Sequence, residues 1–429
     1  MTALQAHKNK KVRKKPFARK AALLGTFAAA MMMAGCYNAD FEKHQVPITE
    51  QLTQQMQKIG VSERDPIFIR IFKKEAELEV WKRSSNGQYT LLKTYEICAW
   101  SGELGPKFKE GDRQAPEGFY KVTPAQMNPN SSFHLAFNLG FPNSYDKSHE
   151  RTGSFLMVHG ACSSAGCYSM EDAQIEEIYA LAREAFLGGQ KKFQVQAFPF
   201  RMTPQNMALF KDNSFMPFWR TLKVGYEHFQ LTKVPPKVDA CNRGYIFNAI
   251  ETDGGSFNAK EECPAFEVPP RLSAAVDAKI KNDRARENTI ASQWTTPKER
   301  KHAELLTKLK IEEARIDKFE DRGLAYSSHQ KRRILETQAA LVKLGYNSDG
   351  SLPQATDTSV IDQAPAQQNT PAGPASDGAP SPLPRPITQS NTAQIEQPNH
   401  ANADGQANSD GPKVASRIAR LGRILSPKK

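Results

Sequence analysis

Short runs of β-branched and aromatic residues, separated by turn-forming residues, fill the chain from about residue 61 to 235. Such runs favour strands, because branched and aromatic side chains pack well on a pleated surface. The clearest runs are Ile67–Phe72, Ala76–Arg83, Tyr89–Trp100, Phe119–Thr123, His134–Leu139, Ser154–Val158 and Phe193–Phe198. The pattern predicts a fold that is mainly β with some α-helix.

Two helices are expected within this β-rich region. Ser169 suits an N-cap position, with Asp172 three residues later, and a pair of glycines ends the helix that follows. The apolar face of that helix consists of Ile175, Ile178, Tyr179, Ala182 and Phe186. Thr203 followed by Pro204 has the order of cap residue and proline that opens a second helix.

The composition of the chain changes after Pro270. Residues 271–346 are dense in Lys, Glu, Arg and Ala, and Thr296-Pro297-Lys298-Glu299 forms a capping box, so a charged helical extension is expected. Residues 347–412 contain no aromatic residue and are rich in Pro, Ala, Gln, Ser and Asn, a composition typical of disorder. Residues 413–429 have the pattern of a basic amphipathic helix, with a disordered basic tail as the alternative.

Positive charge is concentrated at the two ends of the chain. Residues 1–20 carry eight Lys or Arg, residues 413–429 carry six, and neither stretch contains an acid. These fourteen charges exceed the net charge of +12, so the rest of the chain has a net charge of about −2. The body therefore gives no reason to expect a nucleic-acid partner. No apolar run reaches the ~18 residues of a spanning helix, which excludes a polytopic membrane protein.

The first 36 residues have the order of a secretory signal. A basic stretch from Lys8 to Lys20 precedes an apolar segment from Ala21 to Met33. The segment ends in Ala34-Gly35-Cys36, which resembles the lipobox of bacterial lipoproteins. The resemblance implies cleavage before Cys36 and its lipidation, so the protein is expected on the periplasmic side of the envelope with a lipid anchor. An ordinary cleaved signal or a short uncleaved anchor is the alternative, and Tyr37 favours the outer membrane over the inner.

Apart from Cys36 the chain has five cysteines, and an odd number in an oxidising compartment suggests one free thiol. Cys241 and Cys263 could close a loop. Cys162 is either a packed small residue or a disulfide partner of Cys98, and the spacing does not fix the pairing.

The segment from Met157 to Met170, MVHGACSSAGCYSM, points to chemistry. A predicted strand ends at His159, and a turn of small residues leads to Cys167 just before the predicted helix. Amides at a helix start favour a thiolate, and a nearby imidazole can accept the thiol proton. Gly166 lets the backbone approach a substrate, where amides of the turn could bind an oxyanion.

The sequence Ser164-Ala165-Gly166-Cys167, with His159-Gly160 upstream, resembles the catalytic motif of the YkuD-type L,D-transpeptidases, and of their YafK-like branch in particular. Further matching stretches are Gly111 to Tyr120, His134 with Phe137 to Asn143, and Phe198 to Thr203. The resemblance covers roughly residues 61–235. It implies a β-sandwich-like catalytic domain that acts on diaminopimelate-containing stem peptides of peptidoglycan through a cysteine thioester.

The resemblance also implies residue roles. Cys167 is the nucleophile and His159 is its base, while Gly166 and Cys167 supply oxyanion amides and Ser164 shapes the turn. Arg201 and His134 are candidates for substrate contact. A structural ion pair is the alternative for Arg201, and a purely structural histidine is the alternative for His134. No metal or organic cofactor is implied.

The spacing within the motif leaves the acyl acceptor open. Only four residues separate His159 from Ser164, which is typical of the YafK-like branch and shorter than in most YkuD-type enzymes. That branch resembles an enzyme that releases a lipoprotein from peptidoglycan. Transpeptidation and hydrolysis are therefore both expected reactions, and a peptidoglycan-linked lipoprotein is a candidate partner.

Two other classes of function fit parts of the sequence. His159, Cys162 and Cys167 have a spacing that could bind zinc, although a closed site needs a fourth ligand. A non-catalytic tether between membrane and wall is the second alternative, but such a tether does not need a reactive thiol beside a histidine.

These patterns divide the chain into seven expected segments. They are a lipoprotein signal peptide (1–35), a tether with a short helix (36–60), the catalytic domain (61–235), a connecting segment (236–270), a charged helical extension (271–346), a disordered linker (347–412) and a basic amphipathic tail (413–429).

Overall fold

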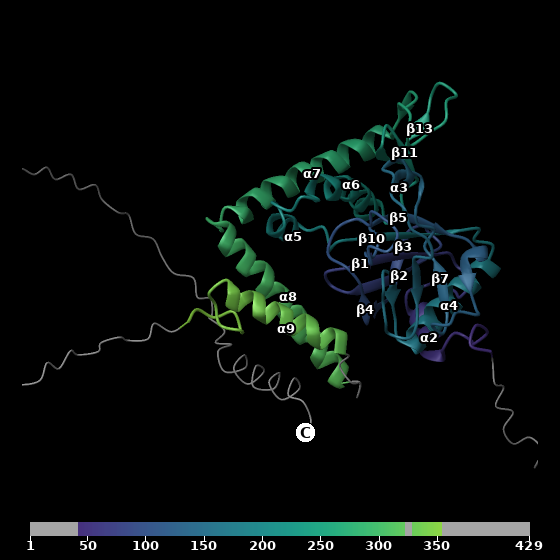
Figure 1. Ribbon diagram of the computed structural model, residues 1–429. Helices are drawn as coiled ribbons and strands as arrows, with labels where there is room; N and C mark the ends of the chain where they lie inside the picture. Colours follow the sequence, from purple (N-terminus) through teal and green to yellow (C-terminus); the bar gives the residue numbers. More distant parts are fainter. Residues whose placement is uncertain (1–41, 322–327, 354–429) are drawn as a thin grey trace, which may run out of the picture. The chain divides into compact units, whose positions relative to one another are not determined.

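The computed structural model describes residues 42–321 and 328–353, which form two units that divide between Thr295 and Thr296 (Figure 1). The expected signal peptide, the lipidation site at Cys36, the basic tail and all but the first seven residues of the expected linker lie outside the described residues. The first unit contains both large sheets and the helices α2 to α7.

Five strands form the first sheet, called sheet A, in the order β3-β2-β1-β10-β5. Their bounds are β1 Ile67–Phe72, β2 Glu77–Arg83, β3 Tyr89–Glu96, β5 Gly118–Val122 and β10 Phe193–Phe198. The central strand β1 pairs in parallel with β10 and antiparallel with β2. All six of its residues are buried, which explains its nearly continuous apolar sequence. The bounds predicted for β1 and β10 are confirmed.

A second sheet, called sheet B, has five much shorter strands in the order β4-β9-β8-β7-β6. Their bounds are β4 Ala99–Trp100, β6 Met127–Asn128, β7 Ala136–Asn138, β8 Met157–His159 and β9 Tyr168–Ser169. The prediction of one strand over Tyr89–Trp100 is wrong, because β3 belongs to sheet A and β4 to sheet B. The chain crosses between the sheets at Ile97 and Cys98, a step that the apolar pattern does not reveal.

One buried apolar cluster contains side chains from both sheets and from α4 (Asp172–Leu187). The rings of Phe137 in β7 and Phe193 in β10 lie 5.7 Å apart, edge to face. Four of the five residues expected on the apolar face of α4 are buried. The predicted N-cap at Ser169 is wrong: Ser169 belongs to β9, where its hydroxyl donates to the Ala99 carbonyl at 2.8 Å, and Glu171 is the N-cap of α4.

The segment expected to be a tether is partly packed onto the domain. Its helix α2 (Glu50–Lys58) buries Leu52 and Met56 in the shared core. Arg183 of α4 donates to the carbonyl oxygens of His44 and Val46 at 2.8 and 3.1 Å. The described part of this segment is therefore a component of the first unit.

Three helices follow β10: α5 Pro204–Leu209, α6 Met216–Thr232 and α7 Pro270–Ala291. Thr203 caps α5 as predicted, with its hydroxyl accepting from the Asn206 amide at 3.3 Å. Lys223 of α6 binds Asp283 of α7 at 2.8 Å, and both side chains are almost completely buried. Helix α7 is thus part of the first unit, whereas the sequence suggested a domain end at residue 235 and a separate extension from residue 271.

The segment between α6 and α7 forms two small hairpins. They are β11 Val238–Cys241 with β12 Gly244–Phe247, and β13 Ile250–Glu251 with β14 Phe266–Glu267. A disulfide between Cys241 and Cys263 closes this segment, as the sequence suggested. Two shorter elements precede β7 and β8: the 3-10 turn η1 Pro124–Gln126 and the helix α3 Ser144–Ser148.

The second unit is a pair of helices, α8 Pro297–Asp321 and α9 Ser328–Lys343. The capping box predicted at its start is confirmed, because Glu299 and Thr296 exchange hydrogen bonds. Glu312 of α8 is fully buried and binds Arg333 of α9 at 2.6 Å. Gly345, with φ of 86°, ends the last helix as predicted.

The described chain is therefore a mixed α/β fold, and the expectation of a mainly β protein is confirmed only in part. Two sheets make up the region from β1 to β10, and helices predominate after it. None of the helices in the described ranges is long and apolar enough to cross a membrane.

Candidate active site

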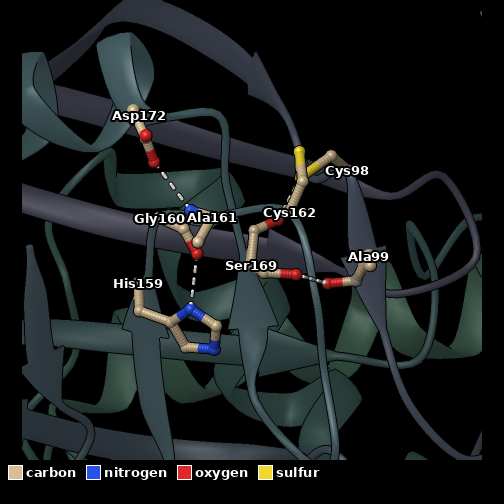
Figure 2. Close-up of a disulfide and its surroundings, with 8 residues drawn as sticks. All are labelled: Cys98, Ala99, His159, Gly160, Ala161, Cys162, Ser169 and Asp172. Atoms are coloured by element: carbon tan, nitrogen blue, oxygen red, sulfur yellow. Dashed lines mark hydrogen bonds between the residues drawn. A yellow bond between two sulfur atoms is a disulfide. The ribbon is translucent and has the colours of Figure 1, made fainter. Parts of the chain in front are cut away.

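Cys167 is the free cysteine of the described residues. The other four form the disulfides Cys98–Cys162 and Cys241–Cys263, so the inference of one unpaired thiol is confirmed. Figure 2 shows the first disulfide, which ties the loop after His159 to the segment before β4. Because the sulfur of Cys162 is bonded to Cys98, it cannot serve as a thiolate ligand, and the zinc hypothesis loses one of its three ligands.

Cys167 and His159 line the same pocket, of about 410 Å³. They come together because β8 and β9 are parallel neighbours: His159 ends β8, and Cys167 directly precedes β9. The other lining residues are Asn128, Asn130, Ser131, Ser132, Phe133, Ala136, Phe155 and Met157. Phe133 and Phe155 are unusually exposed for their size, at 45% and 72%, so the pocket offers a substrate aromatic surface.

The thiol of Cys167 is held as a neutral group. Burial raises the pKa of this thiol, and the amide of Met157 and the charge of Lys107 only partly oppose that effect. The Met157 amide donates to Sγ at 3.4 Å, and Sγ lies 3.7 Å from the carbonyl oxygen of Phe155. The expectation of a helix start behind the thiol is wrong, because β9 follows Cys167 and α4 begins only at Asp172.

The imidazole of His159 is held as a neutral base. Its Nδ1 lies 2.6 Å from the carbonyl oxygen of Gly160, and a carbonyl only accepts, so Nδ1 carries the proton and Nε2 has the free lone pair. Burial lowers the pKa of His159, more than the bond to Gly160 raises it. The ring packs against Phe133, with centroids 4.8 Å apart. A neutral imidazole that lines the same pocket as a neutral thiol is suited to general-base activation of a nucleophile.

Serine hydroxyls fix the turn that precedes Cys167. Ser164 donates its hydroxyl hydrogen to the Cys167 carbonyl at 2.7 Å and accepts from the Gly166 amide at 3.3 Å. Ser101 donates to the Ser164 carbonyl at 2.7 Å. Gly166 has φ of 134°, a conformation that other residues rarely adopt, so glycine is needed here for the backbone itself.

The first unit matches known proteins over its sheet region. Residues 67–194 match the YkuD family, described as the L,D-transpeptidase catalytic domain. Over 200 residues the chain is 42% identical to the protein named "Putative L,D-transpeptidase YafK" in Escherichia coli strain K12. This match covers 47% of this chain and 78% of that protein. The chain belongs to the YkuD L,D-transpeptidase family.

Two solved structures resemble the chain more distantly. The helical cell shape determining protein Pgp2 of Campylobacter jejuni is 19% identical, with a TM-score of 0.26, over 44% of this chain and 80% of that one. Bd1075 of Bdellovibrio bacteriovorus is 15% identical, with a TM-score of 0.25, over 47% of this chain and 94% of that one.

Arg201 and His134, the two residues suggested for substrate contact, do not line the pocket that contains Cys167. Arg201 binds Glu77 and Glu79 of β2 at 2.6 and 2.7 Å, so the ion-pair alternative describes it. His134 directs its Nε2 to Glu176 of α4 at 2.6 Å and does not line the pocket.

Sequence reasoning missed several residues of the YkuD site. Phe133 and Phe155 form pocket walls. In the sequence Phe133 directly precedes the strand-like run His134–Leu139 and Phe155 lies within the run Ser154–Val158, so nothing distinguishes either from a core aromatic residue. Ser101 supports the turn from more than 60 residues away, and no local pattern indicates it. Asp172 was read only as a helix-start residue, yet its carboxylate reaches the Ala161 amide at 2.7 Å.

Proposed function

We propose that this YkuD domain catalyses cysteine-dependent acyl transfer on peptidoglycan stem peptides that contain diaminopimelate. The observation that carries the proposal is the placement of the free thiol of Cys167 and the Nδ1-protonated imidazole of His159 in one pocket. The membership in the L,D-transpeptidase family supports the substrate class.

The resting charges define the first chemical step. Both groups are neutral, so the thiol proton passes to Nε2 of His159 as Sγ attacks the carbonyl carbon at the L-centre of diaminopimelate. The Nδ1 proton stays on the imidazolium and continues to bind the Gly160 carbonyl. The Gly166 amide is directed to Ser164, so we assign the oxyanion mainly to the amide of Cys167.

Collapse of the tetrahedral intermediate completes acylation. The C–N bond to the terminal D-alanine breaks, and the amine leaves with the proton from Nε2 of His159. A thioester between Cys167 and the stem peptide remains. An amine then resolves it in transpeptidation or attachment, or water resolves it in hydrolysis, and His159 accepts the proton of either acceptor.

The decisive experiment incubates the purified protein with disaccharide tetrapeptide muropeptides and with lipoprotein-linked muropeptides. Mass spectrometry should find an acyl adduct on the peptide that contains Cys167, with loss of D-alanine from the tetrapeptide. Cross-linked products indicate transpeptidation, tripeptides alone indicate hydrolysis, and release of the lipoprotein peptide indicates the hydrolase alternative.

Cys167→Ala should lower turnover at least about 10³-fold, because no other group replaces the nucleophile. Cys241→Ala paired with Cys263→Ala is the matched control, since it removes two sulfurs that do not line the pocket and leaves the nucleophile and its loop unchanged. The proposal is overturned when wild type and Cys167→Ala behave alike, or when Cys167 stays unmodified with every substrate while the protein still binds peptidoglycan, which is the behaviour of a tether.

We further propose that the protein is anchored on the periplasmic side of the bacterial envelope through lipid on Cys36, with the outer membrane as the favoured location. The two disulfides of the first unit support an oxidising compartment. Labelled palmitate should enter the wild type and not Cys36→Ala. Equal labelling of the two would reject the anchor and leave the enzymatic proposal untouched.

A further inference from the structure

A single peptide unit, the one between Gly160 and Ala161, lies between His159 and Asp172. Its carbonyl oxygen is 2.6 Å from Nδ1 of His159, and its amide donates to Oδ1 of Asp172 at 2.7 Å. Figure 2 shows both bonds, on opposite sides of the same peptide. A hydrogen bond from an amide to a carboxylate polarises the peptide and strengthens its carbonyl as an acceptor.

We propose that Asp172 is a positioning residue for the acyl transfer proposed above, acting on His159 through the Gly160–Ala161 peptide. Its carboxylate holds the plane of this peptide, so that the Gly160 carbonyl faces Nδ1 and fixes the tautomer with a free Nε2. When Nε2 accepts the thiol proton, the polarised carbonyl stabilises the imidazolium. The effect of Asp172 on acyl transfer rests on the proposed function. The hydrogen bonds that join Asp172, the Gly160–Ala161 peptide and His159 do not.

The glycine at position 160 supports this assignment independently. A Cβ there would lie 2.6 Å from Oδ1 of Asp172, 3.0 Å from Cβ of His134 and 3.1 Å from Cγ2 of Ile175. Its φ lies outside the left-handed region, so glycine is required for space rather than for backbone conformation. The absent side chain is what lets the Asp172 carboxylate reach this peptide.

Other contacts hold the same loop without supplying charge. The Gly160 amide donates to the carbonyl oxygens of Phe133 and Leu135 at 3.0 and 3.1 Å, and the Cys162 amide donates to Met170 at 3.3 Å. The disulfide of Cys162 adds a covalent restraint. Removal of the Asp172 charge should therefore alter the electrostatics of the peptide before it alters the path of the loop.

Several titratable groups face these residues and enter the pH analysis. Oδ2 of Asp172 lies 3.9 Å from Nδ1 of His134, whose Nε2 is bound by Glu176. On the other side, His159 shares its pocket with Cys167, whose thiol is influenced by Lys107. The histidine signals must therefore be assigned before any shift is attributed to His159.

A simpler role for Asp172 is stabilisation of α4, because an acid in the first turn of a helix interacts well with the helix dipole. That role predicts a loss of stability and no effect on the imidazole. The test therefore measures the pKa of His159 as well as rates.

The experiment uses the full-length protein as wild type, Asp172→Asn, Asp172→Ala and the control Glu177→Gln. Glu177 lies on the same helix as Asp172 and binds Lys93. The substitution Glu177→Gln removes one negative charge, as Asp172→Asn does. The pKa of His159 is followed by NMR of isotopically labelled histidine, with the signal among the nine histidines assigned through His159→Gln. The rate of Cys167 acylation is measured by mass spectrometry across pH.

Asp172→Asn retains an acceptor for the Ala161 amide but loses the charge. We expect the pKa of His159 to fall by about half a pH unit and acylation to slow about fivefold, since charged acceptors bind roughly twice as strongly as neutral ones. Asp172→Ala should slow acylation about 20-fold. In both variants KM should stay within about twofold, and the acid limb of the pH profile should move down with the pKa.

The inference is overturned when Asp172→Asn leaves the His159 pKa at the wild-type value, or when its effects equal those of Glu177→Gln. It is also overturned when the loss of rate follows only the loss of thermal stability. A shifted pKa in a protein that leaves every muropeptide unchanged would keep the contact with His159 and reject the proposed function instead.

Discussion

The two sheets of the first unit are built in different ways. Sheet A has strands of five to eight residues, whereas no strand of sheet B is longer than three. The long strands hold one another through long backbone ladders, of which the one between β2 and β3 has a register shift between Val80 and Trp81. The short strands of sheet B make few such bonds, and side chains supply the rest, including the Cys98–Cys162 disulfide and the hydroxyl bonds of Ser164 and Ser169.

This difference suggests that stability and catalysis depend on different parts of the domain. Sheet A holds the fold, and buried charges at the ends of its strands are individually expensive to disturb. Sheet B holds Cys167 and His159, and changes there should lower activity before they unfold the protein. The following predictions test this separation, in order of decreasing expected effect.

The largest loss of stability is expected from Lys73→Met, at the end of β1. Lys73 binds Glu117 at 3.0 Å, and both side chains are completely buried. Removal of the cation leaves the Glu117 carboxylate in the interior with only the Gly105 amide and the Trp219 indole as donors, which should cost about 4 kcal/mol of unfolding free energy. Urea unfolding measures this, with Lys93→Met as the control, because its partly exposed pair with Glu177 should cost at most about 1 kcal/mol.

The two disulfides should separate stability from activity. Removal of either pair by double alanine substitution should cost about 3 kcal/mol. Loss of Cys98–Cys162, which restrains the loop between His159 and Cys167, should also lower acylation about tenfold at a temperature where the variant is folded. Loss of Cys241–Cys263 should leave acylation within about twofold. Equal activity losses in the two variants would contradict the assignment of catalysis to sheet B and its loop.

The pH dependence of the acylation rate and of thiolate absorbance should show that His159 and Cys167 are both neutral near pH 7. Because the pKa of His159 is lowered from 6.5, the acid limb of acylation should lie below pH 6.5. Because the pKa of Cys167 is raised from 9.0, the midpoint of thiolate formation in the folded protein should lie above pH 9. Cys167 in the urea-unfolded chain is the reference and should ionise at a lower pH. A folded protein that shows thiolate at neutral pH would contradict the mechanism.

The smallest effect is expected from Arg201→Gln. Its guanidinium binds Glu77 and Glu79 of sheet A and is about one-third exposed, so stability should fall by about 1 kcal/mol while kcat and KM stay within about twofold. Phe155→Ala should do the opposite, raising KM several-fold with little loss of stability, because this exposed ring lines the pocket. A clear rise of KM in Arg201→Gln would place Arg201 at the substrate after all.

The sequence predicted the elements of sheet A better than those of sheet B. The bounds of β1 and β10 were correct because β1 is an almost continuous apolar run and β10 alternates apolar residues with glutamine. The strands β4 and β9 have two residues each, too few for any period to show. The shortness of β9 also explains the misplaced start of α4. Ser169 lies just before the helix and has the residue type of an N-cap, although it is the second residue of a two-residue strand.

The candidate site was predicted through its motif rather than through its surroundings. Cys167, His159 and the turn at Ser164 are close in sequence, and their spacing alone indicated a thiol beside an imidazole. Their electrostatics were predicted wrongly, since local sequence suggested an activated thiolate, whereas the structure has a half-buried thiol whose pKa is raised by desolvation. The pKa of the thiol depends on residues distant in sequence, such as Phe133, which lines the pocket, and Lys107, whose charge lowers the pKa, and no local pattern reports either.

The sequence by itself determined which groups can react, because cysteine, histidine and small turn residues at this spacing have few other uses. It also determined the long strands, since the residues of a strand that is buried on both faces of a sheet are mostly apolar. Only the tertiary structure decided the protonation of the pair, the partners of the other cysteines and the reach of Asp172 to the peptide beside His159. These properties depend on distances between segments that come together only when the chain folds, and on how far the folded chain removes each group from water.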